Sequence, residues 1–273
     1  MVIISDVHLG TYGCHSEELL KYLKSIKAKH LILNGDIIDM WQFNKSYWPK
    51  THTQVLRHIT GLITKKTKVT YLTGNHDETL RKFSGFRLGG FQLADKKVLT
   101  VDGKKVWIFH GDVFDVIMRN SKWLAKLGAF GYDILILINT FINYLLKIFG
   151  RDKISLSKKV KDGVKKAVKF IDDFEQTAAH IAISNQYDYV VCGHIHQPQI
   201  RKIKTEKGEV TYLNSGDWVE NLTALEYNEG KWEIYKYHND PKAQKYKLPK
   251  RFKDNKNNEE IFSDLVSQFL ITQ

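Results

Sequence analysis

Short apolar runs recur along the chain, and most of them end in a polar residue or a glycine-containing loop. They are rich in β-branched and aromatic residues, which is typical of buried strands. The runs are residues 2–5, 31–34, 69–73, 106–110, 189–192 and 211–214. Between the first three, residues 16–27 and 53–65 carry apolar side chains at helical spacing, and Ser16 is placed to cap the first helix. This alternation predicts an α/β fold with a largely parallel central sheet.

The second half of the sequence adds hairpins and a long helical segment. Residues 96–110 predict a hairpin with its turn at Asp102-Gly103, and further hairpins are expected after residue 200. Between these strand regions, residues from about 117 to 180 follow a helical pattern throughout. We therefore expect an inserted helical cap at about 117–180.

Five of the predicted strands are followed by residues of the kind that bind metal ions. Because the carboxyl ends of strands in an open α/β sheet meet at one edge, these side chains are expected to converge on one site. A glycine before a polar residue also permits close approach of the backbone. The clusters, in chain order, are Asp6-Val7-His8, Gly35-Asp36, Gly74-Asn75-His76-Asp77, His110-Gly111-Asp112 and Gly193-His194-Ile195-His196.

The ligand types in these clusters are carboxylate, imidazole and amide. Such a set suits Mn²⁺, Fe²⁺ or Zn²⁺ and differs from the thiolate set of a zinc finger. Each cluster alone is weak evidence. All five in this order are strong evidence, because so many unpaired Asp and His side chains would be costly to bury without a cation.

On these motifs, the sequence resembles the calcineurin-like metallophosphoesterase family over roughly its first 200 residues. The resemblance implies a four-layer αββα sandwich, placed at residues 1–240 and interrupted by the cap, with a dinuclear metal centre. It implies Mn²⁺ as the cofactor, with Fe²⁺ and Zn²⁺ as alternatives, and hydrolysis of a phosphoester or diphosphate by a metal-activated hydroxide. No Ser or Cys nucleophile is then needed.

The resemblance also assigns roles to individual residues. His76 is expected to act as general acid or to stabilise charge on the phosphate, with Asp77 orienting it. Independently of the resemblance, Asp39 and Asp112 are expected to orient metal ligands. The residues assigned to one ion are Asp6, His8, Asp36 and His196. Those assigned to the other ion are Asp36, Asn75, His110 and His194, so Asp36 bridges the two.

A narrower resemblance is to the UDP-2,3-diacylglucosamine diphosphatase branch. It is carried by SDVHLG, LNGDIIDMWQF, the helical insertion after HGDVFD, and LNSGDWVENLTALEY. That branch acts in lipid A synthesis at the cytoplasmic membrane face and holds acyl chains with a helical cap, so the resemblance implies a lipid-linked nucleotide sugar as substrate. One departure concerns His76, where the branch has arginine in a Gly-Asn-Arg-Asp motif.

The distribution of charge along the chain indicates which partners to expect. The net charge is +12, and residues 117–170 contribute 12 Lys and Arg against 3 Asp. Residues 242–256 add 7 Lys and Arg against 1 Asp, so the remainder of the chain is near neutral. They belong to a basic tail at 241–273, whose end has the spacing of a short amphipathic helix. Cap and tail thus suit an anionic membrane surface, and we expect a cytoplasmic protein bound peripherally to the inner face of the membrane.

Composition excludes several classes. Two cysteines provide no disulfide framework, and an average hydrophobic content of 42% argues against disorder. The first residues lack the basic start of a secretory signal. The apolar window 130–150 is long enough to span a bilayer, but its Asp, Asn and Lys residues favour a buried or lipid-facing helix instead.

Other side chains have more than one interpretation. Arg81, Lys82 and Trp123 are candidates for substrate contact, and solvated charge or helix packing is the alternative. For Trp41, packing in the core is favoured over stacking on a nucleobase.

Two other functions stay open. One is a nucleotide phosphodiesterase or nuclease of the same superfamily, although few aromatic residues lie among the lysines to stack bases. The other is a non-catalytic scaffold, which the complete ligand set disfavours. The pattern does not indicate an oligomeric state.

Overall fold

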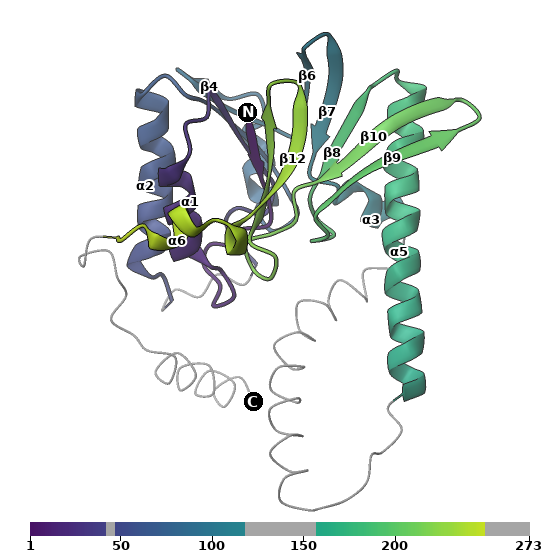
Figure 1. The fold of residues 1–273 in the computed structure, drawn as a ribbon, viewed down its shortest axis with the longest axis horizontal. Coiled ribbons are helices and arrows are strands. Elements are labelled where there is room, and N and C mark those ends of the chain that lie inside the picture. Colours follow the sequence, from purple (N-terminus) through teal and green to yellow (C-terminus); the bar gives the residue numbers. More distant parts are fainter. Residues whose placement is uncertain (42–46, 118–156, 249–273) are drawn as a thin grey trace, which may run out of the picture. The chain divides into compact units, whose positions relative to one another are not determined.

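The computed structural model describes residues 1–41, 47–117 and 157–248 (Figure 1). It comprises two compact units, one formed by Met1–Gly111 with Ala178–Gln273 and the other by Asp112–Thr177. Much of the expected cap and most of the expected tail lie outside the described residues, so the domain boundaries stay predictions. Within the described ranges, no helix has both the length and the apolar character needed to cross a bilayer.

The first unit contains a seven-stranded sheet with a parallel centre. Its strands are β1 (Val2–Ile4), β2 (His30–Asn34), β3 (Lys68–Leu72), β4 (Arg87–Leu88), β5 (Phe91–Ala94), β11 (Thr223–Asn228) and β12 (Lys231–Lys236). They lie in the order β12-β11-β1-β2-β3-β5-β4. The pairs among β1, β2, β3 and β5 are parallel, and those that add β11, β12 and β4 are antiparallel. The predicted parallel centre is confirmed.

A second sheet of five strands holds the remaining ligand loops. Its strands are β6 (Lys96–Val101), β7 (Lys104–Phe109), β8 (Tyr189–Cys192), β9 (Gln199–Thr205) and β10 (Gly208–Asn214), in the order β6-β7-β8-β10-β9. The hairpin predicted at 96–110 is confirmed, with φ values of 48° and 78° at Asp102 and Gly103. Left-handed backbone at both positions matches the twist of the flanking strands.

Helices α1 (Ser16–Ser25) and α2 (Lys50–Thr64) lie together beside the first sheet (Figure 1). The prediction that Ser16 caps α1 is wrong. Its hydroxyl lies 2.7 Å from the hydroxyl of Thr51, so it links the starts of the two helices, and no side chain caps α1. The remaining elements are η1 (Glu78–Phe83), α3 (Val113–Ile117), α5 (Ser157–Ser184), η2 (Tyr237–Asn239) and α6 (Pro241–Lys245).

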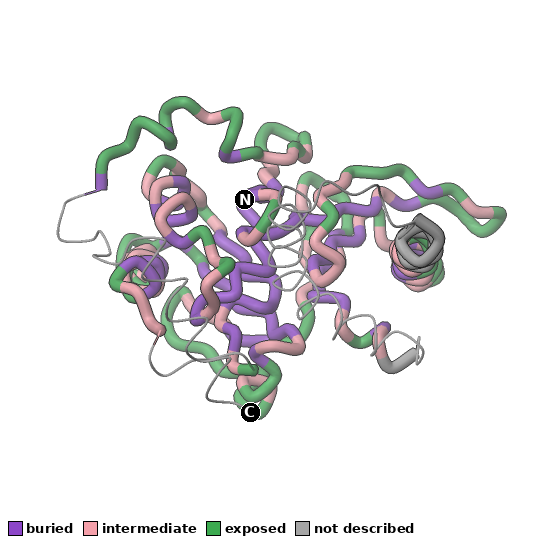
Figure 2. Tube along the Cα trace, turned by 90° about the horizontal axis from the view of Figure 1, so that it is seen from below, coloured by how far each residue is buried: buried purple, intermediate pink, exposed green. Residues whose placement is uncertain are grey.

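The central strands are buried on both faces, because helices cover one face of the first sheet and the second sheet covers the other. In β1, Val2 and Ile4 belong to the core shared with α1 and α2, whereas Ile3 belongs to the core between the sheets. The end of α5 supplies the fourth layer, since Ile183 lies 3.3 Å from the position of a Cβ on Gly208 in β10. Figure 2 shows the buried residues gathered along these strands. The predicted fold class is confirmed, and the strands point their carboxyl ends toward one edge.

Candidate metal centre

The loops at this edge hold their polar side chains on strained backbone. Left-handed φ values occur at Asp6 (51°), His8 (54°), Asp36 (53°), His194 (68°) and His196 (53°). Such a conformation costs residues with a Cβ on the order of 1 kcal/mol each, and it persists only where the surroundings enforce it. Its concentration in the predicted ligand motifs marks this edge as a functional site.

Backbone hydrogen bonds between the loops enforce these conformations. The amides of Val7 and His8 both donate to the carbonyl of Asp36 at 2.9 Å. The amide of Gly193 donates to the carbonyl of His110 at 2.9 Å. The first and second strands' loops are therefore fixed to each other, and so are the loops after β7 and β8.

Three glycines allow the loops to approach this closely. A Cβ on Gly35 would lie 2.3 Å from His110 Nδ1, and a Cβ on Gly74 would lie 2.2 Å from Asp36 Oδ1. A Cβ on Gly193 would lie 2.6 Å from Asp6 Oδ2. The sequence-based interpretation of these glycines as positions of close approach is confirmed.

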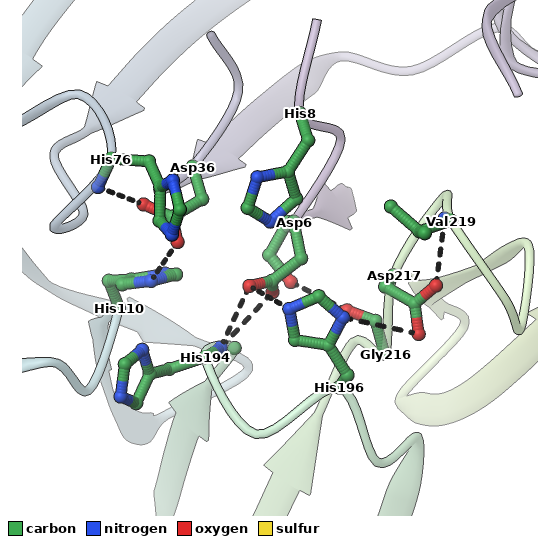
Figure 3. Close-up of polar contacts among 12 residues, drawn as sticks. Asp6, His8, Asp36, His76, His110, His194, His196, Gly216, Asp217 and Val219 are labelled. Atoms are coloured by element: carbon green, nitrogen blue, oxygen red, sulfur yellow. Dashed lines mark hydrogen bonds and ion pairs between the residues drawn. The ribbon is translucent and has the colours of Figure 1, made fainter. Parts of the chain in front are cut away.

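One group of potential ligands consists of Asp6, His8 and His196, whose ligand atoms lie within 4.8 Å of one another (Figure 3). His196 Nε2 lies 3.2 Å from Asp6 Oδ1. Asp6 also accepts hydrogen bonds from the amide of His194, at 3.2 and 3.1 Å to its two oxygens. The carboxylate is thus oriented between the two sheets' loops.

A second group consists of Asp36, His110 and His194, also within 4.8 Å of one another. His110 Nε2 lies 3.1 Å from Asp36 Oδ2, and His110 Nδ1 donates to the carbonyl of Asn34 at 2.9 Å. The other oxygen of Asp36 accepts the amide of His76 at 2.9 Å. Each group contains three of the four residues expected for one ion.

Asp39 joins the first group to His76. A single oxygen, Oδ2, lies 3.0 Å from His8 Nδ1 and 2.8 Å from His76 Nδ1. Because these contacts use the Nδ1 atoms, they leave the Nε2 atoms of both rings for other partners. Asp39 therefore orients one expected metal ligand and the expected general acid together, as is common for carboxylates behind metal-binding histidines.

Asp77 has a different role from the one expected. We expected it to orient His76, but that contact belongs to Asp39. The buried carboxylate of Asp77 accepts the amides of Gly74 (2.6 Å) and Ile37 (3.0 Å) and the hydroxyl of Tyr71 (2.6 Å). It therefore stabilises the backbone of the ligand loop, and burial raises its pKa.

Trp41 lies at the rim of the site. The preference for core packing is wrong, since 58% of this side chain is exposed. Its ring centroid lies 4.5 Å from that of His76 at an interplanar angle of 34°. The indole thus covers one face of the imidazole and leaves its own outer face to solvent.

The carboxylates of both groups are prepared for cation binding. Burial alone would raise the pKa of Asp6, but His196 and His110 outweigh it and hold the pKa at about 2. For Asp36, burial is likewise outweighed, chiefly by His110, and the pKa lies well below its usual range. Conversely, burial lowers the pKa of His196, whereas Asp6 and Asp217 raise it to about 9 overall. Cation and proton therefore compete for this imidazole.

Two buried atoms support the fit of this residue set to metal ions. His8 Nε2 and Asn75 Oδ1 are both shielded from solvent and have no hydrogen-bond partner in the described part of the chain. Leaving such atoms unsatisfied costs about 1–3 kcal/mol each. An imidazole nitrogen and an amide oxygen are both suitable ligands for a divalent cation. The residues at this edge therefore fit a metal site.

The other predicted residues are less closely tied to the site. Arg81 Nη2 donates to the carbonyl of Gly74 at 3.3 Å, and Lys82 is exposed on η1. Trp123 lies outside the described residues, and Asp112 belongs to the second unit, so their roles stay predictions.

Asn221 is a further residue behind the site, and it was not among the predicted site residues. Its side-chain amide donates to the carbonyl of His196 at 2.9 Å and to Asp217 Oδ2 at 2.6 Å. The available signal was the polar segment NSGDWVEN, in which an Asp precedes several backbone amides that a turn could direct at it.

Comparisons with known proteins bear on the same region. A family model described as Calcineurin-like phosphoesterase matches residues 1–198. The UDP-2,3-diacylglucosamine hydrolase of Blochmanniella pennsylvanica is 26% identical over 84% of this chain and 92% of its own. The protein of that name from Aliivibrio fischeri is 24% identical over 86% and 98%. The solved structure of Yfce, a phosphoesterase from E. coli, aligns over 86% and 92% at 14% identity and a TM-score of 0.44. The range matched by the family model contains all five ligand motifs.

Replacing Gly74 should damage the site selectively. In Gly74→Ala, the new Cβ must displace Asp36 or His110, so we expect the affinity for Mn²⁺ to fall about 10-fold or more. The measurement is a competition titration of Mn²⁺ against a chelating dye.

Gly61→Ala in α2 is the matched control. A Cβ there meets nothing within 4 Å, so this variant should bind Mn²⁺ like the wild type. It should also unfold with a free energy about 0.5–1 kcal/mol higher, as expected for Gly to Ala within a helix. Unchanged Mn²⁺ affinity in Gly74→Ala would contradict the close approach described above.

Proposed function

Because the chain belongs to the calcineurin-like phosphoesterase family, we propose that this hydrolase cleaves the diphosphate of a lipid-linked nucleotide sugar such as UDP-2,3-diacylglucosamine. The proposal for the substrate is supported by the two relatives named for that activity, which align along nearly their full length. The observation that carries the hydrolytic chemistry is the pairing of two ligand groups at one sheet edge, with His76 beside them.

We assign the two ligand groups to two divalent cations, with Mn²⁺ as the first choice. Bound cations of this kind neutralise phosphoryl oxygens and lower the pKa of water, so that a nucleophile is available near neutral pH. The set for one ion is Asp6, His8, Asp36 and His196. The set for the other is Asp36, Asn75, His110 and His194.

His76 is the proposed proton donor and phosphate-binding group. Its Nδ1 is held by Asp39, and Nε2 remains for a phosphoryl or leaving-group oxygen. Burial lowers its pKa, but Asp39 and Asp36 outweigh burial and raise the pKa above its usual value. Trp41 shields one face of this imidazole from water and restricts its rotation.

The substrate's other parts have candidate partners near the site. Arg81 is held at the Gly74 loop, where its guanidinium suits a phosphate. We keep Lys82 and Trp123 as further candidates for substrate contact, and Asp112 as a residue that orients ligands. His76 occupies the place of the branch's arginine, so this position distinguishes the chain from that branch.

We further propose that the protein works at the inner face of the cytoplasmic membrane, because the substrate is a lipid. The apolar cap sequence and its basic continuation support this, and so does an edge strip in the described residues. The edge strip comprises Phe83, Phe86 and Leu88, which are 61%, 51% and 68% exposed.

The charge around the edge strip complements an anionic bilayer. Arg81, Lys82 and Arg87 lie within the same segment, and no acidic residue lies between residues 79 and 94. Lys97 is a further cation near Arg87 and Lys68, and burial together with these two charges lowers its pKa. Exposed aromatic and aliphatic side chains among cations are typical of interfacial membrane contact.

The metal assignment predicts the effect of Asp36→Asn. This change removes the carboxylate shared by both ligand sets, so we expect hydrolysis with Mn²⁺ to fall by at least about 100-fold. The control is Asp102→Asn, which changes an exposed turn carboxylate bonded to Tyr227 and should hydrolyse at the wild-type rate. Equal rates in Asp36→Asn and the wild type would disprove a shared carboxylate.

The substrate proposal predicts a ranking of hydrolysis rates. With Mn²⁺, the wild type should act on UDP-2,3-diacylglucosamine with a kcat/KM at least about 10-fold above simple phosphodiesters, free nucleotides and single-stranded DNA. The products are separated by chromatography and quantified for each substrate. Faster cleavage of single-stranded DNA than of the lipid would instead support a nuclease and overturn the proposed substrate.

The edge strip predicts a dependence on lipid charge. The wild type should float with vesicles that contain phosphatidylglycerol and stay behind with vesicles of phosphatidylcholine alone. Phe83→Ser with Leu88→Ser should lower the bound fraction. Ile200→Ser, at a 40% exposed apolar residue on β9, is the control and should float like the wild type. Equal flotation of the double variant would exclude the edge strip as the contact.

A further inference from the structure

The loop between β10 and β11 lies directly behind the first ligand group. We call residues 215–221 the support loop; Ser215, Asp217 and Trp218 in it are fully buried. The amide of Trp218 donates to the carbonyl of Asp6 at 3.0 Å. The hydroxyls of Ser5 and Ser215 lie 2.6 Å apart. The loop is thus fixed to the end of β1, where the first ligands begin.

The carboxylate of Asp217 organises the support loop. Oδ1 accepts the amides of Val219 at 2.8 Å and Asn221 at 3.1 Å, together with the amide of Glu220. Oδ2 accepts the side-chain amide of Asn221 at 2.6 Å. A buried carboxylate that accepts so many hydrogen bonds fixes the turn that carries Asn221.

Asn221 connects the support loop to His196, a potential metal ligand. Its Nδ2 also donates to the carbonyl of His196 at 2.9 Å. The backbone of His196 has a left-handed φ of 53°, which is strained for a residue with a Cβ. A hydrogen bond to the carbonyl of that residue opposes relaxation to an ordinary conformation.

The imidazole of His196 has its two nitrogens directed to different carboxylates (Figure 3). Nε2 lies 3.2 Å from Asp6 Oδ1, in the ligand group, and Nδ1 lies 3.8 Å from Asp217 Oδ2. The histidines of the neighbouring motifs have a similar arrangement, since Asp39 lies behind His8 and the Asn34 carbonyl behind His110. Asp217 is the corresponding group behind His196.

We propose that Asp217 and Asn221 are positioning residues, which hold His196 so that Nε2 is directed at the cation bound by Asp6. Asp217 provides the carboxylate behind the ring, and Asn221 fixes the backbone from which the ring extends. The inference rests on the proposed metal assignment. The affinity for the ion bound by Asp6 then depends on the support loop, whose residues need not contact that ion.

Asp240 provides a matched control for a purely structural role. Its carboxylate accepts the amides of Lys242 at 2.9 Å and Ala243 at 3.0 Å, where it caps α6. It also lies 3.0 Å from the hydroxyl of Tyr235. Asp217 and Asp240 therefore both stabilise a turn through backbone amides, but only Asp217 faces a potential metal ligand.

The experiment compares Asp217→Asn, Asn221→Ala and Asp240→Asn with the wild type. Mn²⁺ binding to the full-length chain is measured by calorimetric titration, and thermal unfolding is measured in a metal chelator. We expect Asp217→Asn and Asn221→Ala to lose about 10–100-fold in affinity at one of two sites. Asp240→Asn should bind like the wild type even if its unfolding temperature falls.

Two results would overturn the inference, and they are distinguishable. Wild-type affinity at both sites in Asn221→Ala means that the loop does not position His196, whereas the metal assignment stands. A wild type that binds no Mn²⁺ removes the assignment itself. Asn221 is only half-buried, so Asn221→Ala decides the matter even if Asp217→Asn fails to fold.

Discussion

The burial of two carboxylates, Asp6 and Asp36, is the constraint on which the rest of the site depends. Both are almost completely shielded from solvent, and both have pKa values held low by neighbouring histidines. An isolated buried charge would cost several kcal/mol, so the fold must supply compensating groups. Backbone amides, imidazoles and a place for cations serve this purpose. The same groups suit the chemistry of a phosphoesterase, because the positive charges that neutralise Asp6 and Asp36 also attract a phosphate.

The two-sheet core makes this arrangement rigid. Strands buried on both faces cannot shift without disturbing either the helices or the opposite sheet, and they fix the starting points of the ligand loops. Left-handed residues and close glycine contacts then bring the loops together, and interloop hydrogen bonds such as that from His8 to Asp36 maintain them. The strain at the site is thus offset by the stability of the core.

The sheet and its ligand loops could be predicted from the sequence because both follow local rules. Apolar runs predict strands, and parallel strands present their carboxyl ends at one edge, so the gathering of Asp6, Asp36 and His110 could be expected. The errors involve choices between side chains that only packing decides. Asp77 is adjacent to His76 in the sequence, and Asp39 is distant from it. The three-dimensional path of the loops nevertheless places the carboxylate of Asp39, and not that of Asp77, against the imidazole of His76. Similarly, Ser16 forms a hydrogen bond with Thr51, and the ring of Trp41 packs at a tilt against that of His76, through contacts distant in sequence. The segment NSGDWVEN could predict a turn at Asp217, but it could not predict that Asn221 in this turn contacts His196, 25 residues away.

We propose that the two ligand groups bind two neighbouring cations that share Asp36. Electron paramagnetic resonance during a Mn²⁺ titration tests it most directly, because two ions that share a ligand are magnetically coupled. We expect the spectrum of a coupled pair to appear as the second equivalent is added. A spectrum of isolated single ions at every ratio, or binding of only one ion, would contradict it.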